Sequence, residues 1–514
     1  MTERRESTVK PSGLGWDVHV PAGAEPDLAS RGTLLQVWLE HWADEPGRPA
    51  IWTSGSGWLT RSQVAELSAR AARRLAGLGL RAGDRLLMSC RPSVELVLAY
   101  VGALRLGLTV VPANTAYTGR ELEHIASDAQ VSAAILDDPE ASRDLRAHVP
   151  GLAVVAPDLA SDEEASAPLD EVDASQVGLL CYTSGTTGRP KGAMLTHGNL
   201  LAGAEALRLA WRWGADDRLV LALPLFHVHG LCNGLHGTLL AGSAAVVLPR
   251  FEPPDVIDAA QAHDATMFFG VPTMYARLVH DPRAPELASL RLAVSGSAPL
   301  PPALFETIEA TMRQRPLERY GMTETLMNAS NPYEGERRPG TVGLPLPGVE
   351  VGFVEDTHEI LVRGPNVLPG YWRNREATDA AFDGEGWFST GDIGAVDDAG
   401  YLQIVARAKE VVITGGLNVY PREVEDVLLA HPSVGEAAVV GAPSEEWGET
   451  VVAFVVPTTG SIDEDELVRH CRAQLAAFKC PRRVWAMGAL PLNAMGKVQR
   501  QTLVEEASRQ GGWS

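Results

Sequence analysis

Residues 182–192 read Tyr-Thr-Ser-Gly-Thr-Thr-Gly-Arg-Pro-Lys-Gly, a combination suited to holding phosphate. Glycines let a backbone approach a ligand and turn its N–H groups inward, and the hydroxyls and Lys191 add donors and a positive charge. The spacing is not that of a Walker A loop, which has G-x-x-x-x-G-K-[ST] at the start of a helix. A flexible linker is the alternative. A linker would require neither Lys191 nor the apolar residues 177–180, which predict a buried strand before the loop.

A second block, residues 318–325, reads Glu-Arg-Tyr-Gly-Met-Thr-Glu-Thr and suits a nucleotide. The ring of Tyr320 can stack on a base, and Thr323 can bind a phosphate oxygen. The carboxylate of Glu324 can hold Mg²⁺, which prefers oxygen ligands shared with substrate phosphates. The alternative is an ordinary polar turn.

Together the two blocks resemble the phosphate loop and the Tyr-Gly-x-Thr-Glu motif of the adenylate-forming superfamily, which includes acyl-CoA synthetases, adenylation domains of peptide synthetases and beetle luciferases. The resemblance covers nearly all of the chain from about residue 30 onward. It implies a two-step reaction: a carboxylate attacks the α-phosphorus of ATP and releases pyrophosphate, and a thiol then displaces AMP from the acyl-adenylate. It also implies the cofactors ATP, Mg²⁺ and coenzyme A.

The resemblance implies roles for individual residues. Lys497 would stabilise charge growing on the α-phosphate, the electrostatic mode that usually dominates catalysis. The other implied catalytic residues are Lys191, Thr323 and Glu324, with Glu324 and Thr187 at the metal. The implied cofactor-binding residues are Thr183, Ser184, Gly185, Thr186, Thr187 and Gly188 at the phosphates; Gly296, Ser297 and Ala298 as the adenine platform; Arg319, Tyr320, Gly321 and Met322 beside it; Asp392 and Arg407 at the ribose; and Gly415 and Gly416 at the CoA tunnel.

The acid substrate is indicated by residues 320–332, which look like the malonyl-CoA synthetase branch of the superfamily. A second carboxylate taken out of water needs an ionic partner, and a guanidinium fork suits it best. We expect Arg291 to supply that fork, with Arg250 as a weaker candidate; an edge-strand arginine facing solvent is the alternative for Arg291. The remaining pocket residues are expected to be His227, His229, Met327, Asn328 and Ser330. The expected substrates are malonate or methylmalonate.

Other functions remain open at this point. One is a CoA ligase for a monocarboxylic or aromatic acid, in which Arg291 only supports the structure. Another is an adenylating enzyme that passes its intermediate to a carrier protein or an amine. A binding protein that lost catalysis and a luciferase-like oxygenase are further alternatives, although the chain keeps the whole set of charged motif residues.

The elements that must position these residues alternate between strand and helix patterns, which predicts an α/β fold with much parallel sheet. Ligands of such sheets bind outside the carboxyl ends of the strands. Residues 219–226 predict a strand that ends at His227 and His229. The resemblance implies a large body of two α/β subdomains plus a small distorted β-barrel, followed by a mobile α+β lid. The expected boundaries are a mobile leader over residues 1–30, the AMP-binding body over 31–408, and the lid over 409–514, hinged near Lys409.

Length and composition agree with this organisation. A chain of 514 residues is too long for one ordinary core, and 45% hydrophobic with 21% charged residues is typical of a globular protein. The net charge of −21 argues against nucleic acid and anionic membranes as partners. Five cysteines without metal-ligand spacing indicate reduced, buried thiols. No secretory signal or apolar run of transmembrane length is seen, so a cytoplasmic location is expected.

Overall fold

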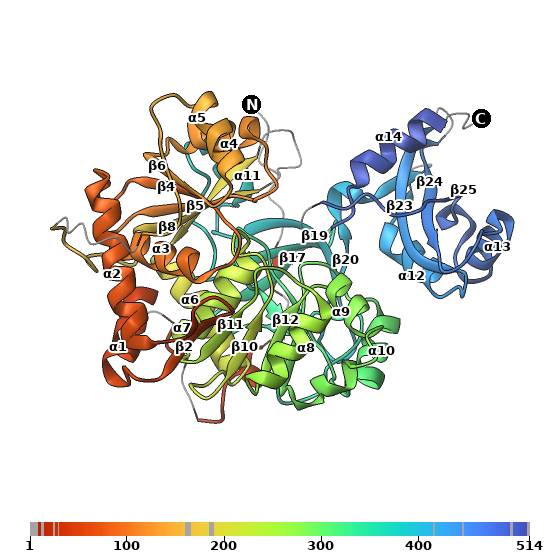
Figure 1. The fold of residues 1–514 in the computed structure, drawn as a ribbon. Helices are drawn as coiled ribbons and strands as arrows, with labels where there is room; N and C mark the ends of the chain where they lie inside the picture. Colours follow the sequence, from red (N-terminus) through yellow and green to blue (C-terminus); the bar gives the residue numbers. More distant parts are fainter. Residues whose placement is uncertain are drawn as a thin grey trace.

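The structure is a computed structural model. It describes residues 9–11, 15–23, 26–28, 30–159, 166–183, 190–414, 417–444, 447–493 and 497–510. Two α/β layers and an antiparallel sheet form a large body, and a smaller unit built from the C-terminal elements lies beside it (Figure 1). Within the described residues, no helix is long and apolar enough to cross a membrane.

The first sheet has six strands in the order β7-β6-β4-β5-β8-β9 and is parallel except for the β8–β9 hairpin. Its strands are β4 (Arg85–Ser89), β5 (Thr109–Pro112), β6 (Ala133–Leu136), β7 (Ala153–Val155), β8 (Val177–Thr183) and β9 (Lys191–Thr196). Its helices are α3 (Val94–Arg105), α4 (Gly119–Ala129) and α5 (Pro139–His148). The buried strand expected before the phosphate loop is thus confirmed as β8.

The second sheet has nine strands in the order β16-β15-β14-β13-β12-β10-β11-β2-β3, and its six central strands are parallel. Its strands are β2 (Pro49–Thr53), β3 (Gly57–Thr60), β10 (Arg218–Leu221), β11 (Ala244–Val247), β12 (Met267–Gly270), β13 (Leu292–Ser295), β14 (Leu317–Tyr320), β15 (Ala329–Ser330) and β16 (Leu344–Pro345). One face is packed by α8 (Pro253–Ala262), α9 (Pro272–Leu278) and α10 (Pro302–Met312) around Phe268, Tyr275 and Phe305. The largest apolar cluster joins this sheet to the first and includes α1 (Leu34–Asp44), α2 (Arg61–Gly77), α6 (His197–Ala210) and α7 (Gly237–Leu240).

The third sheet is antiparallel, with five strands in the open order β1-β17-β18-β19-β20, and it stands where the small barrel was expected. Its strands are β1 (Val9–Pro11), β17 (Glu350–Val354), β18 (Glu359–Arg363), β19 (Phe388–Val396) and β20 (Leu402–Arg407), and α11 (Arg375–Ala381) lies between β18 and β19 in the chain. β19 and β20 form an antiparallel hairpin that brings Asp392 opposite Arg407.

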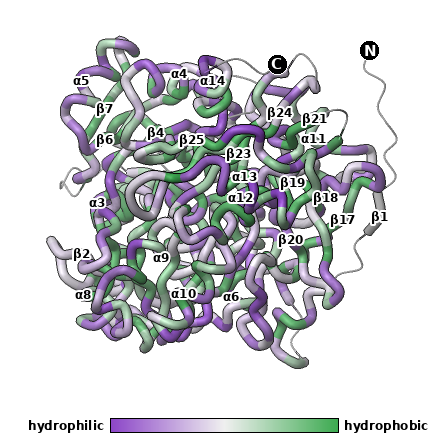
Figure 2. The backbone as a smooth tube through the Cα atoms, turned by 90° about the vertical axis from the view of Figure 1, so that its right-hand side faces the viewer, coloured by the Kyte–Doolittle hydropathy of each residue, from purple (hydrophilic) through white to green (hydrophobic). Residues whose placement is uncertain are grey.

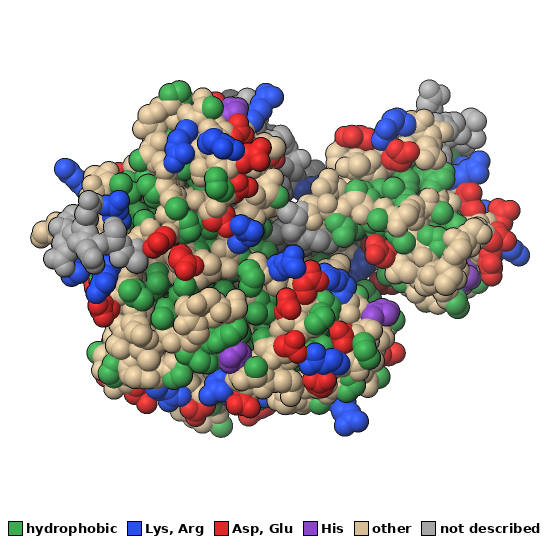
Figure 3. Space-filling model, in the orientation of Figure 1, with side chains coloured by type: hydrophobic (Ala, Val, Ile, Leu, Met, Phe, Trp, Pro, Cys, Tyr) green, Lys and Arg blue, Asp and Glu red, His purple; other side chains and the backbone are tan. Residues whose placement is uncertain are grey.

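The C-terminal unit has its own five-stranded sheet, β22-β21-β24-β23 with β25 beside β24, and its own apolar clusters. Its elements are β21 (Val412–Thr414), β22 (Leu417–Val419), α12 (Pro421–Leu429), β23 (Val434–Ser444), β24 (Gly448–Pro457), α13 (Glu464–Gln474), β25 (Arg483–Ala486) and α14 (Arg500–Gln510). Figure 2 views the molecule from the side of this unit, which there lies in front of the body. Basic and acidic side chains are interspersed over the body and this unit in the view of Figure 3.

One expected strand is wrong. Residues 219–226 do not continue as a strand to the two histidines, because β10 ends at Leu221 and a π-helix runs over His229–His236. Every residue of this π-helix is buried. The apolar residues here are therefore in the interior, as predicted, but they belong to a helix and not to an extended strand. Segments of π-helix are often found at functional sites.

Candidate active site

The residues expected at the ribose form a hydrogen-bonded group at the carboxyl end of β14. The hydroxyl of Tyr320, the last residue of β14, donates to Oδ2 of Asp392 at 2.6 Å. Asp392 and Arg407 face each other across β19 and β20, and Arg407 Nε lies 2.7 Å from Asp392 Oδ1. Burial raises the pKa of Asp392, and the Arg407 charge and the Tyr320 hydrogen bond partly offset this rise. A carboxylate oriented in this way can accept hydrogen bonds from the hydroxyls of a sugar.

The expected adenine platform, Gly296, Ser297 and Ala298, follows directly after β13. A side chain at Gly296 would collide with the guanidinium of Arg319, so only glycine lets that guanidinium lie against the backbone here. Ser297 has φ of 70°, in the left-handed region, and its Oγ lies 3.1 Å from Nδ1 of His229. The platform therefore joins the nucleotide end of the site to the π-helix.

The guanidinium of Arg319 is buried, and two of its three nitrogens have no hydrogen-bond partner in the part of the chain that the structure describes. Its side chain is 4% exposed, and neither Nε nor Nη2 has a hydrogen-bond partner among the described residues. Burial lowers the pKa of this guanidinium, and the neighbouring Glu318 carboxylate opposes the shift. An unpaired charge in the interior costs free energy unless a counter-charge arrives. Arg319 is therefore placed to bind an anion.

The two histidines expected in the acid pocket lie beside Arg319 and are neutral. Burial, together with the nearby charges of Lys497 and Arg319, lowers the pKa of His227 to about 3. Burial, with Arg319 as the next cause, also holds the pKa of His229 well below its ordinary value. Nε2 of His229 is buried and has no hydrogen-bond partner among the described residues. A neutral imidazole in this position can donate or accept one hydrogen bond without adding charge.

Lys497 approaches this group from the C-terminal unit. Lys497 lies three residues before α14, which begins at Arg500. The backbone N–H of Asn493 donates to the carbonyl oxygen of Lys497 at 2.8 Å. Burial lowers the pKa of its ammonium, Arg407 and Arg319 lower it further, and Asp392 and Glu324 raise it. The lysine expected to act in the first half-reaction is thus near the charged residues of the body.

Glu324, expected at the triphosphate and metal, is 7% exposed in the turn after β14. Its Oε1 accepts a hydrogen bond from the hydroxyl of Tyr371 at 3.2 Å. The ammonium of Lys191 lies over the Tyr371 ring, 5.4 Å from its centroid. Thr323 precedes Glu324 in the same turn and is half-buried. Tyr371 was not expected from sequence, because a Gly-Tyr-Trp run carries no chemical signature by itself.

These residues fit the cofactors that the resemblance implies. A single carboxylate such as Glu324 beside substrate phosphates is the usual protein contribution to a Mg²⁺ site. Gly321 has no space for a side chain, because a Cβ there would strike Met327 and the Leu326 carbonyl, and Met322 is half-buried. Thr183 ends β8, and its hydroxyl donates weakly to the Lys191 carbonyl at 3.5 Å. Several expected residues lie outside the described part of the chain: Ser184, Gly185, Thr186, Thr187, Gly188, Gly415 and Gly416.

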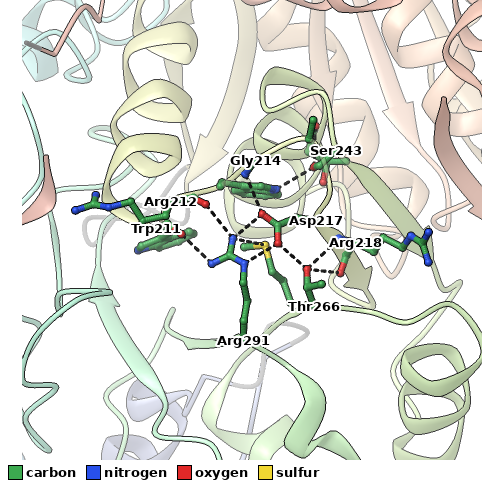
Figure 4. Close-up of polar contacts among 12 residues, drawn as sticks. Trp211, Arg212, Gly214, Asp217, Arg218, Ser243, Thr266 and Arg291 are labelled. Atoms are coloured by element: carbon green, nitrogen blue, oxygen red, sulfur yellow. Dashed lines mark hydrogen bonds and ion pairs between the residues drawn. The ribbon is translucent and has the colours of Figure 1, made fainter. Parts of the chain in front are cut away.

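Arg291 does not extend toward this site, which corrects the expectation that it binds the acid. It precedes the first residue of β13, whereas the platform follows the last one, so Arg291 lies at the opposite edge of a parallel sheet. Its guanidinium forks onto both oxygens of Asp217, with Nε–Oδ1 and Nη2–Oδ2 distances of 2.6 Å (Figure 4). It also donates to the carbonyls of Trp211 and Arg212. Arg291 is therefore fully engaged in a structural ion pair.

The other residues expected in the acid pocket lie in different environments. Met327 is buried, and its sulfur accepts from the amide of Asn233 at 3.4 Å. The Ser330 hydroxyl is engaged elsewhere, because it accepts from Trp211 Nε1 at 3.0 Å and donates to the Asn331 carbonyl at 2.8 Å. Arg250, the weaker cation candidate, is a surface residue whose side chain is 77% exposed. Arg319, which the resemblance places beside the adenine platform, is thus a buried cation with two nitrogens that have no hydrogen-bond partner among the described residues, whereas Arg291 is paired with Asp217.

Comparison with known proteins places the chain among CoA ligases. The pattern of the AMP-binding enzyme family matches residues 39–372, and that of the AMP-binding enzyme C-terminal domain matches residues 423–497. The crystal structure of ATP-bound MatB from Rhodopseudomonas palustris is similar with a TM-score of 0.87 and 38% identity, over 92% of this chain and 99% of that one.

Curated relatives act on different acids by their names. An oxalate–CoA ligase of Arabidopsis thaliana is 36% identical, over 90% of this chain and 96% of its own. A malonate–CoA ligase of the same plant is 34% identical, over 84% of this chain and 80% of its own. Others at comparable identity are named a feruloyl-CoA synthase and a long-chain-fatty-acid–CoA ligase. These similarities establish the reaction class and leave the acid to be decided from the site.

Proposed function

The chain belongs to the AMP-binding enzyme family and is an ATP-dependent acid–CoA ligase, and on that premise we propose that its acid is a short dicarboxylate such as malonate or methylmalonate. The observation that carries this proposal is the buried guanidinium of Arg319, whose Nε and Nη2 lack hydrogen-bond partners among the described residues. A monocarboxylic acid would bring no second charge to satisfy it.

The remaining contacts support a small polar acid. The distal carboxylate would bind the Arg319 fork in a charge-assisted pair, which is the strongest geometry available to a guanidinium. Ser297 and His229, hydrogen-bonded to each other at 3.1 Å, would flank the acid with neutral polar atoms. The relatives named for oxalate and malonate act on acids of this class.

The other residues take the roles that their positions support. Tyr320 and the Gly296–Ala298 platform would hold adenine, and Asp392 with Arg407 would bind the ribose. Glu324 would carry Mg²⁺. The ammonium of Lys497 would face the α-phosphate, where its charge stabilises the transition state of adenylate formation. When bound, the metal supplies charge neutralisation on the triphosphate.

We further propose that the C-terminal unit turns about Lys409 between the two half-reactions, so that Lys497 leaves when the thiol enters. The placement of Lys497 among Asp392, Arg407 and Arg319 supports its presence in the first half-reaction. Closure steps of this kind often limit turnover.

The test is pyrophosphate release with ATP and Mg²⁺ across malonate, methylmalonate, acetate, octanoate and benzoate, each with and without CoA. We expect release and thioester formation with the two dicarboxylates. Preferential release with acetate, octanoate or benzoate would refute the dicarboxylate proposal while leaving the ligase chemistry in place.

A further inference from the structure

Tyr371 is held from several sides by backbone hydrogen bonds, although it lies in a segment without regular secondary structure. Trp372 N donates to the Gly192 carbonyl at 2.7 Å, and Met194 N donates to the Gly370 carbonyl at 3.2 Å. Tyr371 N donates to Oγ1 of Thr378 at 2.9 Å. These bonds tie the segment to β9, the strand that begins at Lys191, so the Tyr371 ring has a fixed position relative to that lysine.

The side chain of Tyr371 contacts the two charged residues of the triphosphate end at once. Its hydroxyl donates to Glu324 Oε1 at 3.2 Å, and its ring lies under the Lys191 ammonium at 5.4 Å. Because a carboxylate only accepts hydrogen bonds, the phenol hydroxyl is the donor in this contact.

We infer that Tyr371 is a positioning residue for the metal–triphosphate end of the site, an inference that rests on the function proposed above. Its hydroxyl donates to one oxygen of the Glu324 carboxylate, so the other oxygen would be left to hold Mg²⁺. Its ring attracts the Lys191 ammonium through the cation–π interaction and holds it near the same carboxylate. One side chain thus sets the spacing between the metal ligand and the phosphate-binding lysine.

The ring also forms part of a wall. An open cavity of about 460 Å³ at the surface is lined by Tyr371 together with Met194, Arg373 and Thr378, among others. The hydroxyl of the same tyrosine reaches the buried Glu324 on the inner side. Tyr371 therefore lies between this open cavity and the Glu324 carboxylate, which is 7% exposed.

The test measures ATP binding by calorimetry over a series of Mg²⁺ concentrations in the absence of any acid, with wild type and Tyr371→Phe. The phenylalanine keeps the wall and the ring under Lys191 but loses the hydrogen bond to Glu324. A hydrogen bond to a charged group contributes enough for its loss to raise the apparent dissociation constant for Mg²⁺ about tenfold. ATP binding without Mg²⁺ should be unchanged.

A matched control is Tyr401→Phe. The Tyr401 hydroxyl also donates a hydrogen bond, to the Glu336 carbonyl at 2.8 Å, and its ring also lies beneath a cation, Arg338 at 4.8 Å. This variant should leave the Mg²⁺ dependence at the wild-type value.

Two results would overturn the inference. Tyr371→Phe could retain the wild-type Mg²⁺ dependence, which would show that the hydroxyl does not orient Glu324. It could instead weaken ATP binding equally with and without Mg²⁺ and lower the melting temperature, which would show a purely structural role. Because no acid is present, these outcomes do not depend on whether malonate is the substrate, and the acid panel with the wild-type enzyme tests that separately.

Discussion

Replacing Arg319 with methionine should make the protein no less stable while removing its activity toward dicarboxylates. The side chain is 4% exposed and lacks hydrogen-bond partners at Nε and Nη2 among the described residues. Methionine has a similar length and carries no charge, so the folded state no longer holds an uncompensated guanidinium. Replacing buried ionic groups by apolar ones of similar volume is neutral or stabilising by about 1–4 kcal/mol.

The loss of activity can be worked out from the same two N–H groups. A carboxylate bound in a fork would gain two charge-assisted hydrogen bonds of about 1.5–3 kcal/mol each. Their loss is therefore about 3–6 kcal/mol, which corresponds to roughly a 10²- to 10⁴-fold decrease in kcat/KM for malonate. The assays are pyrophosphate release with malonate and the free energy of unfolding in urea, and ATP binding by calorimetry should not change.

Arg291→Met is the matched control, because it removes the same charge from a site where that charge is paired. Asp217, 7% exposed and bonded also to Gly214 and Thr266, would keep its carboxylate without its main counter-ion. Breaking a buried pair in this way costs about 3–5 kcal/mol of stability. The KM of Arg291→Met for the acid should be unchanged. The reasoning would be refuted if Arg319→Met lost stability like Arg291→Met, or if it turned malonate over at the wild-type rate.

Other predictions concern charge and pH. Lys497→Ala should abolish pyrophosphate release but spare thioester formation from supplied acyl-adenylate; equal loss of both half-reactions in coupled assays would contradict its assigned role. Asp392→Asn should weaken ATP binding by about tenfold, because a charged acceptor and its bond to Arg407 are lost, and unchanged calorimetric affinity would argue against a ribose contact. Burial raises the pKa of Glu318 from 4.5 to about 7, so the folded state binds more protons than the unfolded state between these values. Stability should therefore fall as pH rises through this window, and Glu318→Gln should flatten that part of the urea stability profile; a profile identical to wild type would show that Glu318 does not titrate there.

The ligand-binding segments of this protein could be identified from short stretches of sequence. Residues 182–192 and 318–325 each combine glycine, hydroxyls and charge within about ten positions, and such chemistry is readable without a fold. The same holds for β8, because its apolar run over residues 177–180 is visible in the sequence as a buried strand. The group formed by Tyr320, Asp392 and Arg407 was also expected, although its members lie up to 87 positions apart, because each belongs to a motif of its own.

Tertiary structure alone decided which arginine is free to bind an anion. Arg291 and Arg319 have the same side chain. Only the fold brings Asp217, 74 positions away, to Arg291, and it leaves Nε and Nη2 of Arg319 without a hydrogen-bond partner among the described residues. The role proposed for Tyr371 could not be predicted from the sequence either, because it depends on the carboxylate of Glu324, 47 positions away, and on the ammonium of Lys191. The physical reason is that a long flexible side chain takes its partner from whatever the packed chain places within its reach, whereas backbone periodicity and loop chemistry act between neighbours in sequence.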